Sequence, residues 1–296
     1  MKNKTFFLLD VFAEQKYFGN QLAVFMDAED LTPEEMQLIA KEMNYSETTF
    51  ILSKTQKKGG YDVRIFTPQH EVPFAGHPTL GTAFVINKEL GSGKEKRVLL
   101  NLKAGQIPVT IFYKDDEVER LEMRQNQPTF HETYDKDQIA GALNLEPIDI
   151  DPGFPVQGVS TGLPFIITPL LSLDAVKRAV VNKNMFFPLI EKTEAKAILV
   201  FCPETYGEEN DINARVFVDY YGIPEDPATG SGNGCLAAYL TAHRFFGQDK
   251  ISVRVEQGYE IARPSILTLN AEKKGDTFDI FVGGQVILVA KAQLFR

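Results

Sequence analysis

Segments in which apolar and polar residues alternate recur along most of the chain. Alternation with a period of two predicts β-strands that bury one face. Clear examples span residues 61–65, 106–113, 120–124 and 277–282. Several strand-like segments follow one another with no helical segment between them, as from Arg97 to Arg124. We therefore predict mixed, mainly antiparallel sheets rather than a regular array of β-α-β units.

Two segments near the start of the chain carry clear element signals. Residues 1–12 combine lysines with a Phe-Phe-Leu-Leu run that Asp10 interrupts, and no small-residue cleavage site follows. We predict a first strand there and not a signal peptide. Further on, Thr32 can cap a helix that begins at Pro33, and Glu35 completes a capping box with Thr32.

Two further helices are predicted at residues 79–90 and 232–246. Apolar side chains occupy nearly the whole circumference of each helix, and a helix without a polar face belongs in a protein core. Gly91 and Gly247 follow the two segments, as glycine often does at helix C-termini. We predict that each helix lies at the centre of a sheet that wraps around it.

A weak internal repeat relates the two halves of the chain. An Arg-Ile-Phe peptide at residues 64–66 precedes Val72 and Pro73, and an Arg-Val-Phe peptide at residues 215–217 precedes Ile-Pro at the same spacing, 151 residues later. One of the two apolar helices follows each copy. The repeat predicts an α+β protein of two pseudo-symmetric domains, each a mixed, mainly antiparallel sheet around a central apolar helix.

The domain boundary is expected near residues 125–128, where polar residues and a proline follow a predicted strand. We therefore assign residues 1–126 to an N-terminal domain that the C-terminal segment 285–296 joins, and residues 127–284 to a C-terminal domain. A length of 296 residues agrees with two domains of about 150 residues each.

Composition and charge exclude several classes of protein. The chain is 44% hydrophobic and 24% charged, so it can form packed cores. Two cysteines cannot support a disulfide scaffold, and we expect a cytoplasmic protein. A formal net charge of −9 without a long basic run disfavours nucleic acid, and no apolar run approaches the ~20 residues of a membrane helix. A small-molecule protein that binds neither nucleic acid nor membrane fits best.

The starts of the two apolar helices are candidate ligand sites. The first turn of a helix presents unpaired backbone N–H groups and a partial positive charge. Gly76 and Gly230 lie at these turns and allow a ligand to approach the backbone closely. We expect the two helix ends together to bind a small anion, such as a carboxylate, where the domains meet. A local site of this kind can hold an anionic substrate on an acidic protein.

Four polar side chains near these turns are candidates for chemistry. Taken alone, Glu47 fits a solvated glutamate at a strand start, and each of the others fits a helix cap or a turn residue. The combination of a Glu, a His, an Asp and a Ser around two amide-rich helix ends is less common. The candidates are Glu47, His77, Asp226 and Ser231.

At these residues the chain resembles the PhzF-like phenazine-biosynthesis isomerases, which have the diaminopimelate-epimerase-like fold. Several motifs occur in the family's order, and together they form a specific signal. They are Asp10-Val11-Phe12, Gly19-Asn20, Ser46-Glu47-Thr48-Thr49-Phe50, Arg64-Ile65-Phe66-Thr67-Pro68, Phe74-Ala75-Gly76-His77-Pro78 and Asp226-Pro227-Ala228-Thr229-Gly230-Ser231.

The resemblance implies a cofactor-independent isomerase, a homodimer, and a site between two similar domains. The residue matching Glu47 is the family's acid/base that moves a proton on a small carboxylate-bearing substrate, and a partly desolvated carboxyl group suits that task. The other implied site residues contact the substrate. These are His77, Asp226, Ser231, Gly76, Gly230 and Asn20.

Other functions stay open at this stage. Racemases of the wider fold use two facing cysteines at these turns, but Cys202 and Cys235 lie elsewhere and fit core positions. The four histidines show no ligand spacing, so we expect no metal. A non-catalytic binding or interaction protein, or an epimerase that does not use cysteine, could use the same scaffold. The sequence names no substrate and implies no role in a phenazine pathway.

Overall fold

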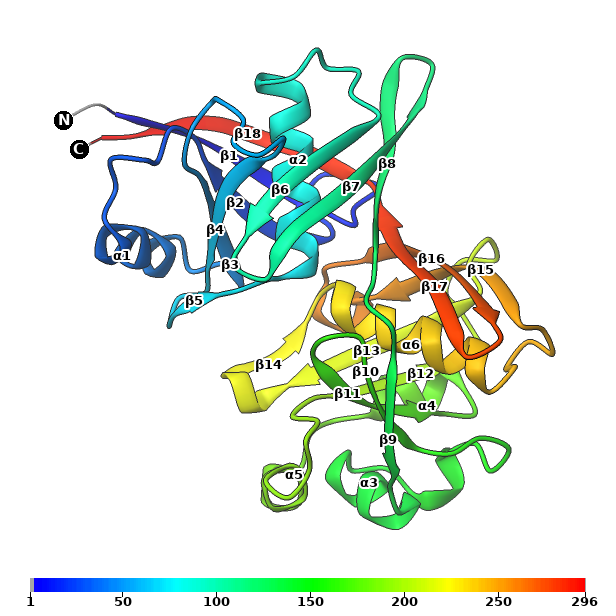
Figure 1. The fold of residues 1–296 in the computed structure, drawn as a ribbon. Helices are drawn as coiled ribbons and strands as arrows, with labels where there is room; N and C mark the ends of the chain where they lie inside the picture. The colour runs from blue at the N-terminus through cyan, green and yellow to red at the C-terminus, as the bar shows by residue number, and fades with distance from the viewer. Residues whose placement is uncertain (1–2, 296) are drawn as a thin grey trace. The chain divides into compact units, whose positions relative to one another are not determined.

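The structure, a computed structural model, describes residues 3–295 (Figure 1). The chain divides into two compact units. The first unit extends from the N-terminus to Arg124 and includes the segment from Gly283 to the C-terminus, and the second extends from Gln125 to Val282. Each unit combines a mixed sheet with a buried helix, which confirms the predicted α+β class.

The first unit contains two α-helices within its strands. Its elements are β1 (Lys4–Val11), β2 (Asn20–Phe25), α1 (Pro33–Met43), β3 (Glu47–Ile51), β4 (Tyr61–Phe66), β5 (Glu71–Val72), α2 (Gly76–Glu89), β6 (Arg97–Leu102), β7 (Gly105–Lys114), β8 (Glu117–Arg124) and β18 (Val286–Leu294).

The second unit has more helical segments. Its elements are β9 (Thr129–Thr133), α3 (Lys136–Ala142), η1 (Pro147–Asp149), β10 (Gln157–Ser160), β11 (Pro164–Pro169), α4 (Leu173–Arg178), α5 (Lys183–Ile190), β12 (Ile198–Cys202), β13 (Ile212–Val218), η2 (Asp219–Tyr221), β14 (Ile223–Asp226), α6 (Gly230–Ala242), β15 (Lys250–Gln257), η3 (Tyr259–Ile261), β16 (Ser265–Lys274) and β17 (Thr277–Gly284).

The same order of strand pairing occurs in both units. In the first, β2 and β3 are parallel, β3 and β4 antiparallel, and β4 and β6 parallel. In the second, β11 and β12 are parallel, β12 and β13 antiparallel, and β13 and β15 parallel. The other pairs with a described register are antiparallel, as predicted. The internal repeat in the sequence therefore marks a repeated structural unit.

A nearly fully buried helix lies against the sheet in each unit. Of the 14 residues of α2, 11 are buried, and the helix contacts β1, β2, β3 and β6 (Figure 1). Of the 13 residues of α6, 11 are buried, and that helix contacts β10, β11, β15 and β16. Both helices are apolar around their circumference because strands cover them on several sides. The predicted burial of both helices is confirmed.

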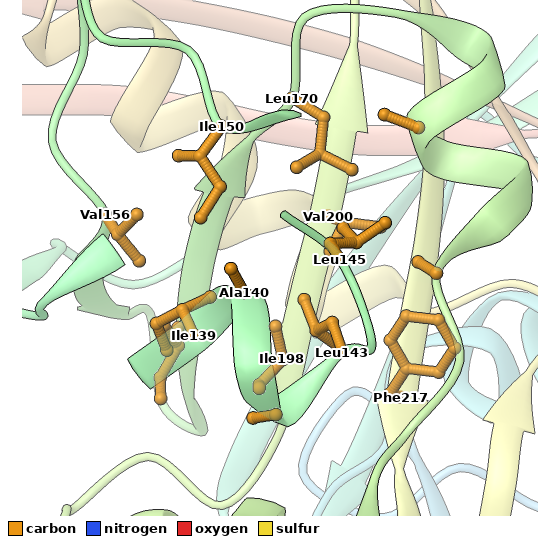
Figure 2. Close-up of a cluster of buried hydrophobic side chains, with 14 of the residues drawn as sticks. Ile139, Ala140, Leu143, Leu145, Ile150, Val156, Leu170, Ile198, Val200 and Phe217 are labelled. Carbon is orange, nitrogen blue, oxygen red and sulfur yellow. The ribbon is translucent and has the colours of Figure 1, made fainter. Parts of the chain in front are cut away.

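A second layer of helices covers the opposite face of the sheet in the second unit. All five residues of β12 are buried, which requires cover on both faces of the strand. Ile198 and Val200 join a cluster with side chains of α3, α4 and α5, and Figure 2 shows Ile198 beside Leu143 and Val200 beside Leu145. Phe201, the residue after Val200, lies on the other face of the strand and contacts Tyr239 of α6 instead. The strand period of two thus divides the core into two layers.

The first unit has a corresponding outer layer, which an aromatic row dominates. Phe6, Phe25, Phe50 and Phe66 come from β1, β2, β3 and β4, and their ring centroids lie 4.8, 5.2 and 5.5 Å apart in succession. Met36 of α1 packs in the same cluster. Such ring pairs stabilise a sheet by about 0.5–1.5 kcal/mol each beyond their buried area.

The capping signals were accurate for one helix, but the two apolar helices differ from their predicted bounds. Thr32 and Glu35 form the predicted capping box at the start of α1. In contrast, α2 begins at Gly76, because Pro78 lies in the first turn, where no backbone N–H donor is needed. The prediction that α6 stops at Gly247 is wrong: it ends at Ala242, and Arg244 already adopts a left-handed φ of 49°.

The repeat also preserves an ion pair that the sequence pattern did not predict. Arg64 on β4 donates to both carboxylate oxygens of Glu71 on β5, at 2.8 Å each. Arg215 on β13 donates in the same way to Glu225 on β14, at 3.0 and 2.8 Å. Each arginine therefore pins a short strand to the strand before it, just ahead of the buried helix.

The two ion pairs differ in their surroundings. The Arg215 side chain is 8% exposed and also donates to the carbonyls of Val176 and Ala179 at the end of α4, at 2.8 Å each. The Arg64 side chain is 23% exposed, and Lys103 also contacts Glu71. The loss of Arg215 would leave the buried Glu225 carboxylate without its arginine and the Ala179 carbonyl without this donor, whereas Glu71 would keep a cation.

We therefore expect Arg215→Met to destabilise the protein much more than Arg64→Met. Breaking a buried pair costs about 3–5 kcal/mol, and breaking a partly exposed one about 1 kcal/mol or less. Urea unfolding of both variants, followed by fluorescence and circular dichroism, measures the difference. Equal losses would show that the two copies of the motif contribute equally to stability.

Candidate active site

Glu47 and His77 lie together in the first unit. The parallel register of β2 and β3 places Leu22 opposite Glu47, the first residue of β3, and His77 is the second residue of α2. Glu47 Oε2 and His77 Nε2 are 3.4 Å apart. Their side chains are 19% and 6% exposed, so the contact is largely shielded from water.

The imidazole of His77 is neutral at physiological pH. Burial lowers its pKa to about 3, and a hydrogen bond with the Gln21 backbone opposes this shift only in part. Nε2 makes no hydrogen bond to any residue that the structure describes, so Nδ1 carries the bond to Gln21. A bond that favours the charged ring is one in which Nδ1–H donates to the carbonyl. The contact with Glu47 is therefore not an ion pair.

This tautomer determines which kind of hydrogen-bonding group His77 presents to Glu47. With its proton on Nδ1, the neutral ring presents the lone pair of Nε2 to Glu47 Oε2. A protonated Glu47 can donate to that lone pair, whereas an ionised Glu47 cannot. The neutral ring therefore offers Glu47 a hydrogen-bond acceptor and not a donor.

The remaining candidates of the first unit surround the same helix end. Gly76 is the first residue of α2, and the side chain of the preceding Ala75 forms no cap. Pro78 has no N–H group, so the unbonded amides of the first turn are those of Gly76 and His77. Asn20 is buried and directly precedes Gln21, which orients His77. The structure thus gathers Glu47, His77, Gly76 and Asn20 on one side of one unit.

The second unit places its candidates at the start of α6. Asp226 ends β14, Gly230 is the first residue of α6, and Ser231 is the second. Ser231 therefore occupies in α6 the position of His77 in α2. Thr229 is the N-cap residue, but its side chain makes no bond to the first turn. The amides of Gly230 and Ser231 are thus available to an acceptor, as in the first unit.

Two residues that the sequence did not single out hold this second group together. Thr229 Oγ1 donates to Asp226 Oδ2 at 2.6 Å, and Gln257 Nε2 donates to the Asp226 carbonyl at 2.8 Å. Thr229 stands inside a quoted motif but looks like an ordinary cap residue. Gln257 ends β15, a strand that shows only alternation, so no local signal could have revealed it.

The cysteines and the described cavities lie outside this chemistry. Cys202 and Cys235 are buried, and burial raises the pKa of each thiol to about 12, so neither is a thiolate at neutral pH. A cavity of 330 Å³ in the first unit has Tyr61, Ile86 and Arg97 among its lining residues, but none of the predicted site residues.

Between residues 3 and 295, no group of three or more His, Cys, Asp or Glu side chains is arranged to hold a metal ion. None of the helices that these residues form has the length and apolar character that a membrane crossing requires.

Comparison with known proteins identifies one family over nearly the whole chain. Residues 9–292 match the family model of the phenazine biosynthesis-like proteins, PhzC/PhzF. The trans-2,3-dihydro-3-hydroxyanthranilate isomerase of Pseudomonas aeruginosa is 34% identical over 273 residues, which cover 91% of this chain and 91% of that protein. A PhzF-family phenazine biosynthesis protein of Bacillus anthracis has a solved structure with a TM-score of 0.91, at 29% identity over 100% of both chains.

A more distant structure shares the fold alone. A probable proline racemase from Agrobacterium radiobacter matches with a TM-score of 0.63 at 12% identity, over 99% of this chain and 93% of that one. This chain and that protein thus share one fold. Both cysteine thiols of this chain are buried. With a family match from residue 9 to residue 292 and a relative named as an isomerase, the chain belongs to the PhzC/PhzF family of phenazine biosynthesis-like isomerases.

Proposed function

We propose that the protein moves a proton between two carbon atoms of a small, cyclic, carboxylate-bearing substrate and that Glu47 carries the proton. The single observation that supports this most strongly is the contact of 3.4 Å between Glu47 Oε2 and the neutral His77 Nε2. The relative named as trans-2,3-dihydro-3-hydroxyanthranilate isomerase suggests the substrate class. A dihydro-hydroxyanthranilate is the first compound to test.

The proposed reaction needs one group that changes its role between two steps. Ionised Glu47 takes a proton from a substrate carbon, and the electron pair of the C–H bond moves into the conjugated system. The new carboxylic O–H is held by the lone pair of His77 Nε2. Glu47 then returns the proton to another carbon, so substrate and product have the same composition and the enzyme regains its first state.

The two helix starts supply the binding groups in this proposal. The substrate carboxylate accepts hydrogen bonds from amides at Gly76 or Gly230, which helix dipoles favour. Asn20 and Ser231 add polar contacts. Asp226 accepts a bond from an amino or hydroxyl group of the substrate, because a carboxylate would repel the substrate carboxylate.

Glu47→Gln should abolish the proton shift, because an amide keeps the shape of the side chain but cannot carry the proton. We expect turnover and deuterium incorporation from D₂O to fall between about 10²- and 10⁴-fold. Nuclear magnetic resonance of the substrate during incubation measures both. The exposed Glu42→Gln, in the same unit, is the matched control and should leave both rates unchanged.

The same assay separates the alternatives. Exchange at the wild-type rate in Glu47→Gln would remove Glu47 from the mechanism. Saturable binding without turnover, across a panel of cyclic and amino-acid-derived carboxylates, would favour a binding protein. Inverted stereochemistry at the exchanging carbon would favour an epimerase, and retained stereochemistry would exclude it.

The neutral state of His77 predicts a dependence of stability on pH. The pKa of His77 is near 3 in the folded protein and about 6.5 in the unfolded chain. Between these values the unfolded chain binds one more proton, so stability falls as the pH falls through this window. From pH 7 to pH 5 the loss from His77 alone is about 2 kcal/mol.

His77→Asn tests this linkage. Asparagine keeps a donor for the Gln21 carbonyl but removes both the titratable ring and the acceptor that faces Glu47. The variant should lose less stability than the wild type between pH 7 and pH 5, as urea unfolding at both values would show. Its turnover should fall at least tenfold at pH 7. An unchanged pH dependence would show that His77 titrates normally in the folded protein.

A further inference from the structure

We propose that Thr229 and Gln257 form a positioning relay that holds the Asp226 carboxylate as a hydrogen-bond acceptor at the start of α6. The inference rests on the proposed function, in which Asp226 contacts the substrate. Neither Thr229 nor Gln257 touches the substrate in this proposal. They act through Asp226 and through the first turn of the helix.

The amide of Gln257 is fully buried, and both of its ends are bonded. Nε2 donates to the Asp226 carbonyl at 2.8 Å and to Thr229 Oγ1 at 3.1 Å. Oε1 accepts from the Thr229 backbone N–H at 3.3 Å and from Asn233 Nδ2 at 2.8 Å. Two acceptors on one side and two donors on the other fix the orientation of this amide.

The orientation of the amide determines the direction of the next hydrogen bond. A threonine hydroxyl has one proton, and Thr229 Oγ1 already accepts a bond from Gln257 Nε2. Its proton is therefore directed to Asp226 Oδ2, 2.6 Å away. An oxygen that receives this donor acts as an acceptor, which favours ionised Asp226 and fixes its rotamer.

The relay also ties the turn to the helix. Asn233 Nδ2 donates to the Thr229 carbonyl at 3.1 Å, besides its bond to Gln257. Gly258, the next residue after Gln257, has a φ of 77°, and a Cβ atom there would lie 2.6 Å from the Pro227 carbonyl oxygen. The backbone of residues 226–229 is thus bonded and packed against the end of β15.

The hydroxyl of Thr229 does not cap α6, although Thr229 is the N-cap residue of this helix. A threonine at an N-cap normally accepts a bond from the first turn, which stabilises a helix by about 1 kcal/mol. Here the side chain makes no such bond and donates to Asp226 instead. The hydroxyl therefore bonds to the Asp226 carboxylate and leaves the first turn of α6 without a side-chain cap. This is expected of a residue that orients a functional group.

Thr229→Val tests the relay, because valine keeps the branched shape but has no hydroxyl. We expect kcat on the dihydro-hydroxyanthranilate to fall tenfold or more with a smaller change in KM. Thr229→Ser restores the hydroxyl and should recover most of the activity. Thr241→Val, which removes another buried hydroxyl bond in α6, is the control and should keep wild-type kcat. The midpoints of thermal unfolding of the two valine variants should be similar.

Gln257→Glu tests the direction of the relay. A glutamate oxygen in place of Nε2 accepts the Thr229 proton and draws it away from Asp226. We expect a loss of kcat similar to that of Thr229→Val. The loss of kcat in the double variant should be smaller than the product of the two single losses, because both variants remove the bond from Thr229 to Asp226.

Two results would overturn the relay. One is a wild-type kcat in Thr229→Val, or a kcat in Thr229→Ser as low as that in Thr229→Val. The other is a crystal structure of Thr229→Val in which the Asp226 side chain has not moved, which requires no activity to observe. Glu47→Gln measured alongside separates the two proposals: if it keeps activity, the proposed function fails, and if it loses activity while Thr229→Val keeps it, the relay alone fails.

Discussion

The burial of two helices within their sheets is the constraint on which the rest of the structure depends. Both α2 and α6 are covered on nearly all sides, so their first turns are held in a largely dry environment. Burial strengthens the electrostatic effect of the N-terminal amides. It also keeps the ring of His77 neutral, because a charged imidazole would lose its hydration there.

The two carboxyl groups of the proposed site have opposite hydrogen-bond surroundings. Glu47 faces the lone pair of His77 Nε2, which can accept a hydrogen bond from a protonated carboxyl group. Asp226 faces a hydroxyl proton, which stabilises the ionised form. In the proposed reaction, these different surroundings suit Glu47 to carry the proton and Asp226 to accept a hydrogen bond. The repeated architecture supplies two similar helix starts, but Glu47 on β3 and Asp226 on β14 come from strands that do not correspond in the two units.

The fold could largely be predicted from the sequence, because alternation, capping residues and apolar helices are local signals. The candidate site could be predicted from the sequence only in part. Glu47 and His77 lie in recognisable motifs, but their contact depends on the register of β2 and β3. Gln257 could not be found, because an amide at the end of an alternating strand shows no local sign of its four partners. The predicted end of α6 was wrong because the chain leaves the helix before Gly247. Arg244 adopts a left-handed φ there, although arginine has no particular preference for that conformation.

The pairing of β1 with β18 has a consequence for how the protein is made. Both ends of the chain belong to one unit, and β1 is antiparallel to both β2 and β18. During synthesis β1 can pair with β2 early, and the phenylalanine row can assemble before the second unit exists. The other edge of β1 stays without its partner until β18 has been synthesised. The second unit, in contrast, is continuous in sequence and can fold while the first is still waiting for its final strand.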